Sequence, residues 1–238
     1  MNEQPKLDAL IFAPHPDDAE IGMGGTIAKM IDAGQRVGIV DMTRGEAGTK
    51  GTAETRALEA RNASEILGIH FRENLDLGDG RIANTDENRL KVVEIIRRCR
   101  SSHIFINTPH DRHPDHIAGA RLVADAFFLA RLPKVETASP AFSARWCFYY
   151  FIHDHRRVTF AVDVTPFYSK KIETMKAYRS QFVDVQLPDH YRYIGMQDYL
   201  SQMEAYNRSV GTLIGCRFAE GFHCDSPIAI PLPTWIES

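Results

Sequence analysis

Two short motifs in this chain combine imidazole and carboxylate side chains within turns that proline residues stiffen. The first, residues 14–18, reads Pro-His-Pro-Asp-Asp, and the second, residues 111–116, reads Asp-Arg-His-Pro-Asp-His. Together they offer enough nitrogen and oxygen ligands for one metal ion and leave a carboxylate and an imidazole free for other work. This set of side chains is typical of a metal-assisted hydrolase.

The first motif places His15 and Asp18 three residues apart across a turn, so both can converge on one ion. Asp17 then points elsewhere and is free to hold a water molecule. Aspartate also caps helices well. Capping would explain one of the two carboxylates, but it would explain neither the second carboxylate nor the histidine.

The second motif places His113 and His116 three residues apart around Pro114. One of them can bind the metal while the other faces the substrate. Asp115 or Asp111 can accept an N–H from an imidazole and thereby set its tautomer and basicity. A polar loop with Asp115 as a helix cap is the simpler alternative, but a second loop with the same residue types argues against it.

The other seven histidines are not assigned as metal ligands. His110 is a candidate partner for a metal ligand. His153 and His155 flank a polar turn, where we expect them to lie in solvent without a second metal. The remaining four are expected to be structural or exposed, or have no assigned role: His70, His103, His190 and His223.

Strand-like and helical patterns alternate four times in the first half of the chain. Apolar runs predict strands at 7–13, 36–42, 69–75 and 103–107, and helical spacing predicts helices at 21–33, 54–67, 88–99 and 117–130. Crossovers of this length are typical of parallel pairing. We therefore expect an α/β fold with a Rossmann-like, open, mostly parallel sheet and helices on both faces. Ligands bind beyond the carboxyl ends of such strands, and each motif directly follows one.

The second half is less regular and predicts a smaller, irregular C-terminal part. Strands are expected at 145–152 and 158–164, and helices at 166–180 and 197–211, with an irregular stretch at 182–194. No linker, repeat or low-complexity tract marks a boundary. We therefore expect a single domain over residues 1–238, in which residues 133–238 complete the sheet and add substrate-side helices to a core at 1–132.

A dinucleotide-binding fold is an alternative. It is suggested by the glycines at 22, 24 and 25 and by the acidic residue at the end of the second predicted strand. Asp41 stands near the place of a ribose-binding acid. However, the first strand-to-helix turn holds two aspartates, which would repel a pyrophosphate. The glycines are better explained by close packing of the helix on the sheet.

Composition narrows the classes of partner. The 238 residues carry a net charge of −3, so no basic surplus favours nucleic acid. No apolar run approaches the roughly 20 residues that cross a bilayer, and the first residues do not form a secretory signal. None of the four cysteines lies in a C-x-x-C pair, although Cys216 and Cys224 could pair. We expect free thiols and a cytoplasmic protein.

The motifs resemble those of a known family. The two metal-type motifs, Thr55-Arg56 at the start of a helix and Ala219-Glu-Gly-Phe222 near the end are similar in order and spacing to the PIG-L/LmbE-like zinc N-deacetylases over nearly the whole chain. Tyr178-Arg-Ser-Gln-Phe182 resembles the branch that deacetylates N-acetylglucosaminyl-malate in bacillithiol biosynthesis. Residues 43–51 and 205–208 depart from that branch.

The resemblance implies specific roles. Zinc would be held by His15, Asp18 and His116, a set that also suits Fe(II). Asp17 would be the general base, and His113, oriented by Asp115, would stabilise the oxyanion. The resemblance places substrate contacts at Arg56, Arg145 and Tyr199. It also implies a homo-oligomer, with a hexamer as the candidate assembly.

The expected activity is hydrolysis of the N-acetyl group of an N-acetylglucosamine conjugate, with N-acetylglucosaminyl-malate as the first candidate and acetate as a product. Alternatives are a deacetylase of another N-acyl sugar or small amide, a phosphoester hydrolase, and a non-catalytic metal- or sugar-binding module. Asp17 distinguishes the last of these, because a binding module needs no carboxylate beside the metal-bound water.

Overall fold

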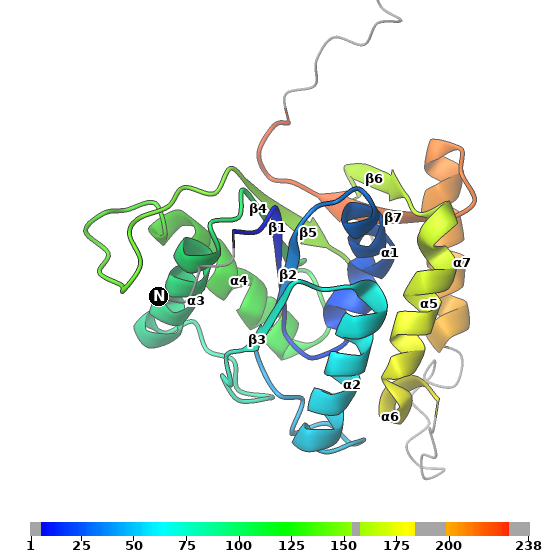
Figure 1. Ribbon diagram of the computed structural model, residues 1–238, viewed down its shortest axis with the longest axis horizontal. Coiled ribbons are helices and arrows are strands. Elements are labelled where there is room, and N and C mark those ends of the chain that lie inside the picture. Colours follow the sequence, from blue (N-terminus) through cyan, green and yellow to red (C-terminus); the bar gives the residue numbers. More distant parts are fainter. Residues whose placement is uncertain (1–5, 154–157, 184–198, 229–238) are drawn as a thin grey trace, which may run out of the picture.

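The computed structural model describes residues 6–153, 158–183 and 199–228. Its centre is a seven-stranded sheet in the order β3-β2-β1-β4-β5-β7-β6 (Figure 1). The first five of these are parallel, and β7 runs antiparallel to both of its neighbours. The strands are β1 (Ala9–Ala13), β2 (Val37–Asp41), β3 (Phe71–Asn74), β4 (His103–Asn107), β5 (Trp146–Tyr150), β6 (Phe160–Asp163) and β7 (Ala219–His223).

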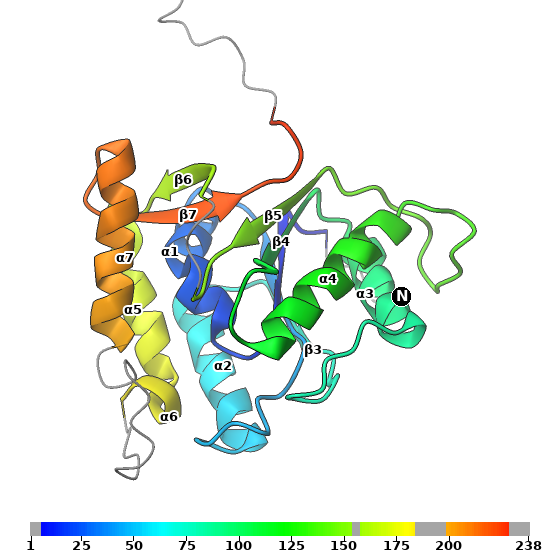
Figure 2. The same cartoon turned by 180° about the vertical axis from the view of Figure 1, so that it is seen from behind.

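Helices cover both faces of the sheet, as the two opposite views show (Figures 1 and 2). One face carries α1 (Asp18–Asp32), α2 (Ala53–Leu67) and α5 (Tyr168–Ala177), and the other carries α3 (Asp86–Cys99) and α4 (Pro114–Leu129). The chain also forms a 3-10 turn, η1 (Thr165–Phe167), a short helix, α6 (Arg179–Phe182), and α7 (Tyr199–Ile214) beside β7. No helix of the described residues is long and apolar enough to span a bilayer.

The expected fold class is confirmed, and so is the alternation of strands and helices through β4. The main element that the sequence reasoning missed is β7, which inserts between β5 and β6 and makes the sheet mixed at one end. Its residues are Ala-Glu-Gly-Phe-His, with a fully buried glutamate between an alanine and a glycine. Most of the irregular stretch expected at 182–194 lies outside the described residues.

Glycines in α1 permit close packing, as expected. A Cβ on Gly22 would lie 2.2 Å from the Tyr150 ring, and one on Gly25 would lie 2.8 Å from Val164. The helix is also kinked between them, because Met23 has φ −146° and ψ 23°. The kink interrupts the helical hydrogen bonding, so the N–H groups that follow it need other acceptors.

Glu220 of β7 supplies those acceptors. Its carboxylate accepts the N–H of Gly25 at 3.0 Å and that of Thr26 at 2.7 Å. The Lys171 ammonium of α5 donates to the same carboxylate at 2.6 Å, and both charged side chains are almost completely buried. We call Lys171 and Glu220 the helix clamp. The glutamate in the Ala-Glu-Gly-Phe motif therefore has a structural role.

Candidate metal centre and active site

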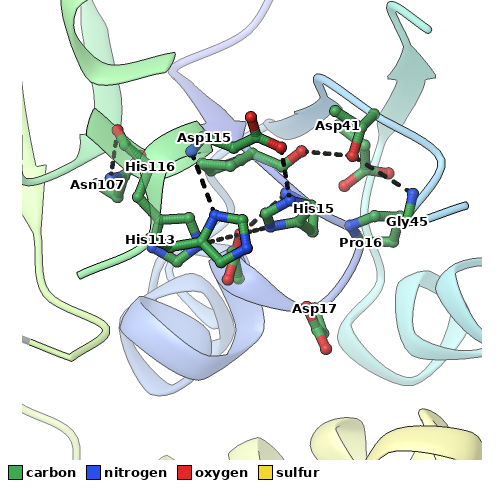
Figure 3. Close-up of polar contacts among 12 residues, drawn as sticks. His15, Pro16, Asp17, Asp41, Gly45, Asn107, His113, Asp115 and His116 are labelled. Atoms are coloured by element: carbon green, nitrogen blue, oxygen red, sulfur yellow. Dashed lines mark hydrogen bonds and ion pairs between the residues drawn. The ribbon is translucent and has the colours of Figure 1, made fainter. Parts of the chain in front are cut away.

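Both motifs lie at the carboxyl edge of the sheet, on neighbouring strands. The first motif follows β1 and leads into α1, and the second follows β4 and leads into α4. Because β1 lies between β2 and β4, the chain turns to opposite sides of the sheet at this point, which is the usual ligand-binding place of open α/β sheets. Figure 3 shows His15, His113 and His116 grouped there.

One carboxylate oxygen joins the two predicted metal-binding histidines. Asp18 Oδ2 lies 3.1 Å from His15 Nδ1 and 3.2 Å from His116 Nε2. The His15 backbone N–H also donates to this oxygen at 2.9 Å, which fixes the carboxylate in the turn. The structure therefore brings together His15, Asp18 and His116, the ligand set that the resemblance implies.

The opposite ring nitrogens face other carboxylates. His15 Nε2 lies 3.1 Å from Asp79 and 3.3 Å from Asp115, and His116 Nδ1 lies 3.1 Å from Asp111. Carboxylates in this position orient metal-binding imidazoles and strengthen them as donors. Asp79 was not predicted. It belongs to the turn after β3, and β3 ends at the same edge of the sheet as β1 and β4. That an aspartate follows a predicted parallel strand was the signal in the sequence that could have identified it.

The charge of this cluster suits a cation. Burial alone lowers the pKa of His116, but Asp18 and Asp111 outweigh it and raise the pKa to about 9. Burial opposes ionisation of Asp79, yet hydrogen bonding to His15 lowers its pKa to about 2. Carboxylates in such numbers attract a proton to the imidazoles, and a divalent ion can replace that proton. The residues present therefore fit a metal ion.

His113 also belongs to this group. Its ring nitrogens come within 4.8 Å of ligand atoms of His15 and His116, which makes a three-histidine set geometrically possible. As the N-cap residue of α4, however, His113 accepts the Asp115 backbone N–H at Nδ1, at 3.2 Å. Nδ1 therefore has no proton, and the neutral ring must carry its proton at Nε2. Burial, followed by the nearby His15, lowers the pKa of His113 and favours this neutral form.

Asp115 contacts both His113 and His15, through different groups. Its backbone N–H contacts His113, whereas its carboxylate faces His15 Nε2 (Figure 3). The same carboxylate accepts the N–H groups of Gly80, at 2.6 Å, and Ile82, at 3.2 Å. Asp115 thus connects both histidines to the loop after β3.

Asp17 lies in an unusual backbone conformation beside the cluster. Its φ is 122°, in a region that residues other than glycine rarely adopt, and its side chain is largely buried. Burial raises the pKa of Asp17 to about 7, against the opposing effect of Arg56. A carboxylate with a pKa near neutrality is suited to general base catalysis, and backbone strain of this kind is frequent in active sites.

Arg56 is not placed where a substrate carboxylate could easily reach it. It is 4% exposed, with Nη2 3.2 Å from Asp17 Oδ1 and a hydrogen bond from the same nitrogen to the Pro16 carbonyl. The guanidinium also lies over the Tyr178 ring, 5.9 Å from its centroid. In this structure Arg56 holds the turn that carries Asp17.

The other two expected substrate contacts differ from each other. Arg145 precedes β5 and lies at the amino edge of the sheet, because Trp146 pairs with His103 at the start of β4. The expectation that Arg145 contacts substrate is therefore wrong for a site within this chain. Tyr199 begins α7 and lies near the cluster: burial and the charges of Asp18 and Asp17 raise its pKa.

The expectation that His153 lies in solvent is also wrong. His153 Nδ1 lies 3.1 Å from Asp111 Oδ1, and its ring stacks on His116 with the centroids 5.4 Å apart. Strand β5 ends just before it, so His153 reaches the same sheet edge as the two motifs. His110 is exposed, and its imidazole makes none of the ligand contacts described above. His155 and His190 lie outside the described residues.

Asp41 belongs to a structural network. Arg72 binds it with two hydrogen bonds, of 2.8 and 2.9 Å, and donates to Glu20 at 2.7 Å. The Tyr178 hydroxyl donates to Glu20 at 2.8 Å. With both carboxylate oxygens engaged by Arg72, Asp41 is not available to bind a ribose. This contact and the aspartates after β1 argue against the dinucleotide alternative.

Residues of the Tyr178–Phe182 motif fix neighbouring elements. Ser180 donates through its backbone N–H and its hydroxyl to Glu59 of α2, at 2.7 and 2.8 Å. Gln181 donates to the Lys50 carbonyl at 3.0 Å and so holds the loop at residues 43–51 in place. These contacts account for the motif without an aglycone, so the motif carries little information about the substrate.

Several known proteins with similar sequences are named as deacetylases. The family described as PIG-L, GlcNAc-PI de-N-acetylase, matches residues 10–127. The diacetylchitobiose deacetylase of Thermococcus kodakarensis is 29% identical over 89% of this chain and 80% of its own length. The "Probable N-acetyl-alpha-D-glucosaminyl L-malate deacetylase 2" of Bacillus cereus is 33% identical over 53% of this chain and 63% of its own length.

A solved structure extends the similarity to nearly the whole chain. The conserved protein TT1542 from Thermus thermophilus superposes with a TM-score of 0.87 at 37% identity, over 95% of this chain and 98% of that protein. The family match covers β1 through most of α4, which includes both metal-type motifs. From its motifs, its fold and these relatives, the chain belongs to the PIG-L/LmbE-like family of deacetylases.

Proposed function

We propose that this protein is a zinc-dependent hydrolase that removes the N-acetyl group from an N-acetylglucosamine conjugate. The observation that carries the proposal is the arrangement around Asp18, whose carboxylate oxygen lies within 3.2 Å of ring nitrogens of both His15 and His116. Asp17 and His113 supply a base and a hydrogen-bond donor beside this set. When bound, zinc would lower the pKa of a water molecule and polarise the amide carbonyl.

The residues of the chain have separate roles in this reaction. Asp17 removes a proton from the attacking water and delivers it to the amine as the C–N bond breaks, so that acetate and a free amine leave. His113 donates its Nε2–H to the carbonyl oxygen as negative charge develops there. His15, Asp18 and His116 hold the metal, and Asp79 and Asp115 keep the His15 imidazole in its binding orientation.

The candidates for the aglycone of the substrate are inferred from the relatives more than from the geometry of the site. N-acetylglucosaminyl-malate is the first candidate because of the Bacillus cereus relative, and diacetylchitobiose is the second because of the Thermococcus kodakarensis relative. The two arginines expected as substrate contacts, which could have bound the carboxylates of malate, do not support the first candidate. Arg56 is paired with Asp17, and Arg145 lies at the opposite edge of the sheet.

Acetate release tests the reaction and the substrate class together. Zinc-loaded protein is incubated with N-acetylglucosaminyl-malate, diacetylchitobiose and free N-acetylglucosamine, and both acetate and free amine are measured. We expect equal amounts of the two products from at least one conjugate. Absence of acetate from all three, with stoichiometric zinc bound, would reject the proposed activity.

Metal content tests the ligand set separately. We expect His116→Ala to lose tightly bound zinc and to keep its fold, because the sheet core does not involve this side chain. His113→Ala should keep zinc and lose turnover. The opposite result, with zinc retained in His116→Ala and lost in His113→Ala, would replace His116 by His113 in the ligand set.

A further inference from the structure

We propose that Asp111, His116 and His153 form a second, weaker site for a divalent cation, adjacent to the metal site proposed above, and that zinc bound there slows turnover. The inference rests on the proposed function, because His116 belongs to both sites. The three residues come from the loop after β4, the first turn of α4 and the segment that follows β5. Each offers a ligand atom within 4.8 Å of the other two.

The Asp111 carboxylate lies between the two imidazoles. Its Oδ2 is 3.1 Å from His116 Nδ1, and its Oδ1 is 3.1 Å from His153 Nδ1. The rings are stacked, with an interplanar angle of 18°. Both Nδ1 atoms therefore approach the same carboxylate from parallel rings, which leaves two nitrogens and one oxygen around a common centre.

His116 Nδ1 provides a second, independent observation. The atom is buried and has no hydrogen bond of acceptable geometry, although Asp111 Oδ2 is only 3.1 Å away. A buried nitrogen without a properly directed acceptor is unusual and needs an explanation. A cation between the two atoms would supply one, since ligands converge on an ion and need not align along an N–H bond.

The ligand types suit zinc. Two imidazoles and a carboxylate with water as a fourth ligand form a common zinc environment. The Asp111 side chain is fully buried, whereas that of His153 is 21% exposed, so an ion could enter from the His153 side. Among the described residues, His153 is the member that takes no part in the first site.

Sharing His116 makes the second site weaker and inhibitory. With its Nε2 directed to the first metal, His116 must release its Nδ1 proton to solvent to bind a second ion. The two cations then repel each other across a single imidazolate ring, so the second ion binds more weakly than the first and disturbs it. A second ion would also attract the Asp111 carboxylate, which lies 3.1 Å from His116 Nδ1, and so change the position of a ring that the first site uses.

Zinc-binding isotherms test the second site. The metal-free full-length protein is dialysed against increasing free Zn²⁺, bound zinc is measured by mass spectrometry, and acetate release is followed over the same range. We expect wild type to bind one tight equivalent and a weaker one that parallels loss of turnover. His153→Gln should bind one equivalent fewer at high zinc, keep the tight one, and lose the inhibition by excess zinc.

Two variants serve as references. His223→Gln, at a histidine of β7 paired with Asp225, should match wild type and reports background binding. His15→Ala should lose the tight equivalent and keep the weaker one, which separates the two sites. His153→Ala repeats the test if the glutamine variant does not fold.

The outcomes separate the two proposals. Equal zinc binding by wild type and both His153 variants would overturn the second site, whatever the first site does. Absence of the tight equivalent or of acetate release from wild type would overturn the proposed function. Loss of one weak equivalent in the His153 variants, without loss in His223→Gln, would support the second site.

Discussion

The helix clamp and the metal centre both bury charged side chains, but their charges are arranged differently. In the clamp, one ammonium and one carboxylate meet, and two backbone N–H groups complete the shell of Glu220. In the metal centre, Asp18, Asp79, Asp111 and Asp115 all face two imidazoles that are neutral when they bind a metal. The clamp is balanced as it stands, whereas the carboxylates of the metal centre carry excess negative charge that protons or a cation must balance.

This difference helps to distinguish structural from functional charge. A buried ion pair that is balanced and fully hydrogen bonded fixes geometry. A buried carboxylate cluster with excess negative charge stays folded only by binding protons or a metal, and it perturbs the pKa values of its members. Comparable substitutions in the two regions should therefore have opposite consequences for turnover and stability.

The largest expected effect is on turnover in the metal centre. Asp17→Asn keeps the shape of the side chain but removes the base. We expect kcat to fall by about 10²- to 10⁴-fold, the usual contribution of general base catalysis. Zinc content should stay near wild type, and the urea unfolding midpoint should fall less than in the clamp variant Glu220→Gln, because Arg56 keeps its hydrogen bond to the Pro16 carbonyl. Turnover within a few-fold of wild type would show that another group is the base.

The same carboxylate-to-amide change in the clamp should act on stability. Glu220→Gln leaves the Lys171 ammonium buried without its counter-charge, and breaking such a pair costs about 3–5 kcal/mol of unfolding free energy. Urea denaturation measures the loss, and kcat of the remaining folded protein should be unchanged. The double variant Lys171→Met/Glu220→Gln should be less destabilised than Glu220→Gln alone. Equal stability of Glu220→Gln and wild type would contradict the role of the clamp.

Arg56 combines features of the clamp and of the metal centre, because it is a buried cation that holds the proposed catalytic carboxylate of Asp17. We expect Arg56→Ala to lower kcat by about 10- to 100-fold, comparable to the loss of a hydrogen bond to a charged group. The loss should be equal for acidic and neutral N-acetyl sugars, with partial recovery in Arg56→Lys. A selective rise of KM for the malate conjugate would instead support carboxylate binding by Arg56.

The smallest expected effect concerns packing near the clamp. Gly22→Ala introduces a methyl group 2.2 Å from the Tyr150 ring, so the ring or helix α1 must move. Overpacking of this kind costs about 1–3 kcal/mol. Thermal unfolding would measure it, and an unchanged melting temperature would show that α1 adjusts its position freely.

Much of the fold could be predicted because hydrophobic patterns determine local structure. The parallel strands through β4 and their helices appeared within a few residues of the expected bounds. Strand β7 could not be found in this way, because its glutamate and glycine contradict a strand pattern. Glu220 is tolerated there only through contacts with α1 and α5, which are distant in sequence.

The residues of the candidate site likewise divide into those that the sequence predicted and those that it did not. The two motifs identified His15, Asp18 and His116 because each motif follows a strand. Asp79 and His153 belong to no motif, and only the three-dimensional arrangement of β3 and β5 brings them to this edge. The position of Arg145 was predictable in principle, since the start of a parallel strand lies at the edge opposite the site.

The clamp has a consequence for the order of folding during synthesis. Helix α1 belongs to the first 32 residues, but Glu220 leaves the ribosome nearly two hundred residues later. Until then, the kinked segment of α1 lacks acceptors for two of its N–H groups. We therefore expect nascent chains that end before β7 to remain incompletely packed at α1 and susceptible to proteolysis there, even though both metal-type motifs have already been made.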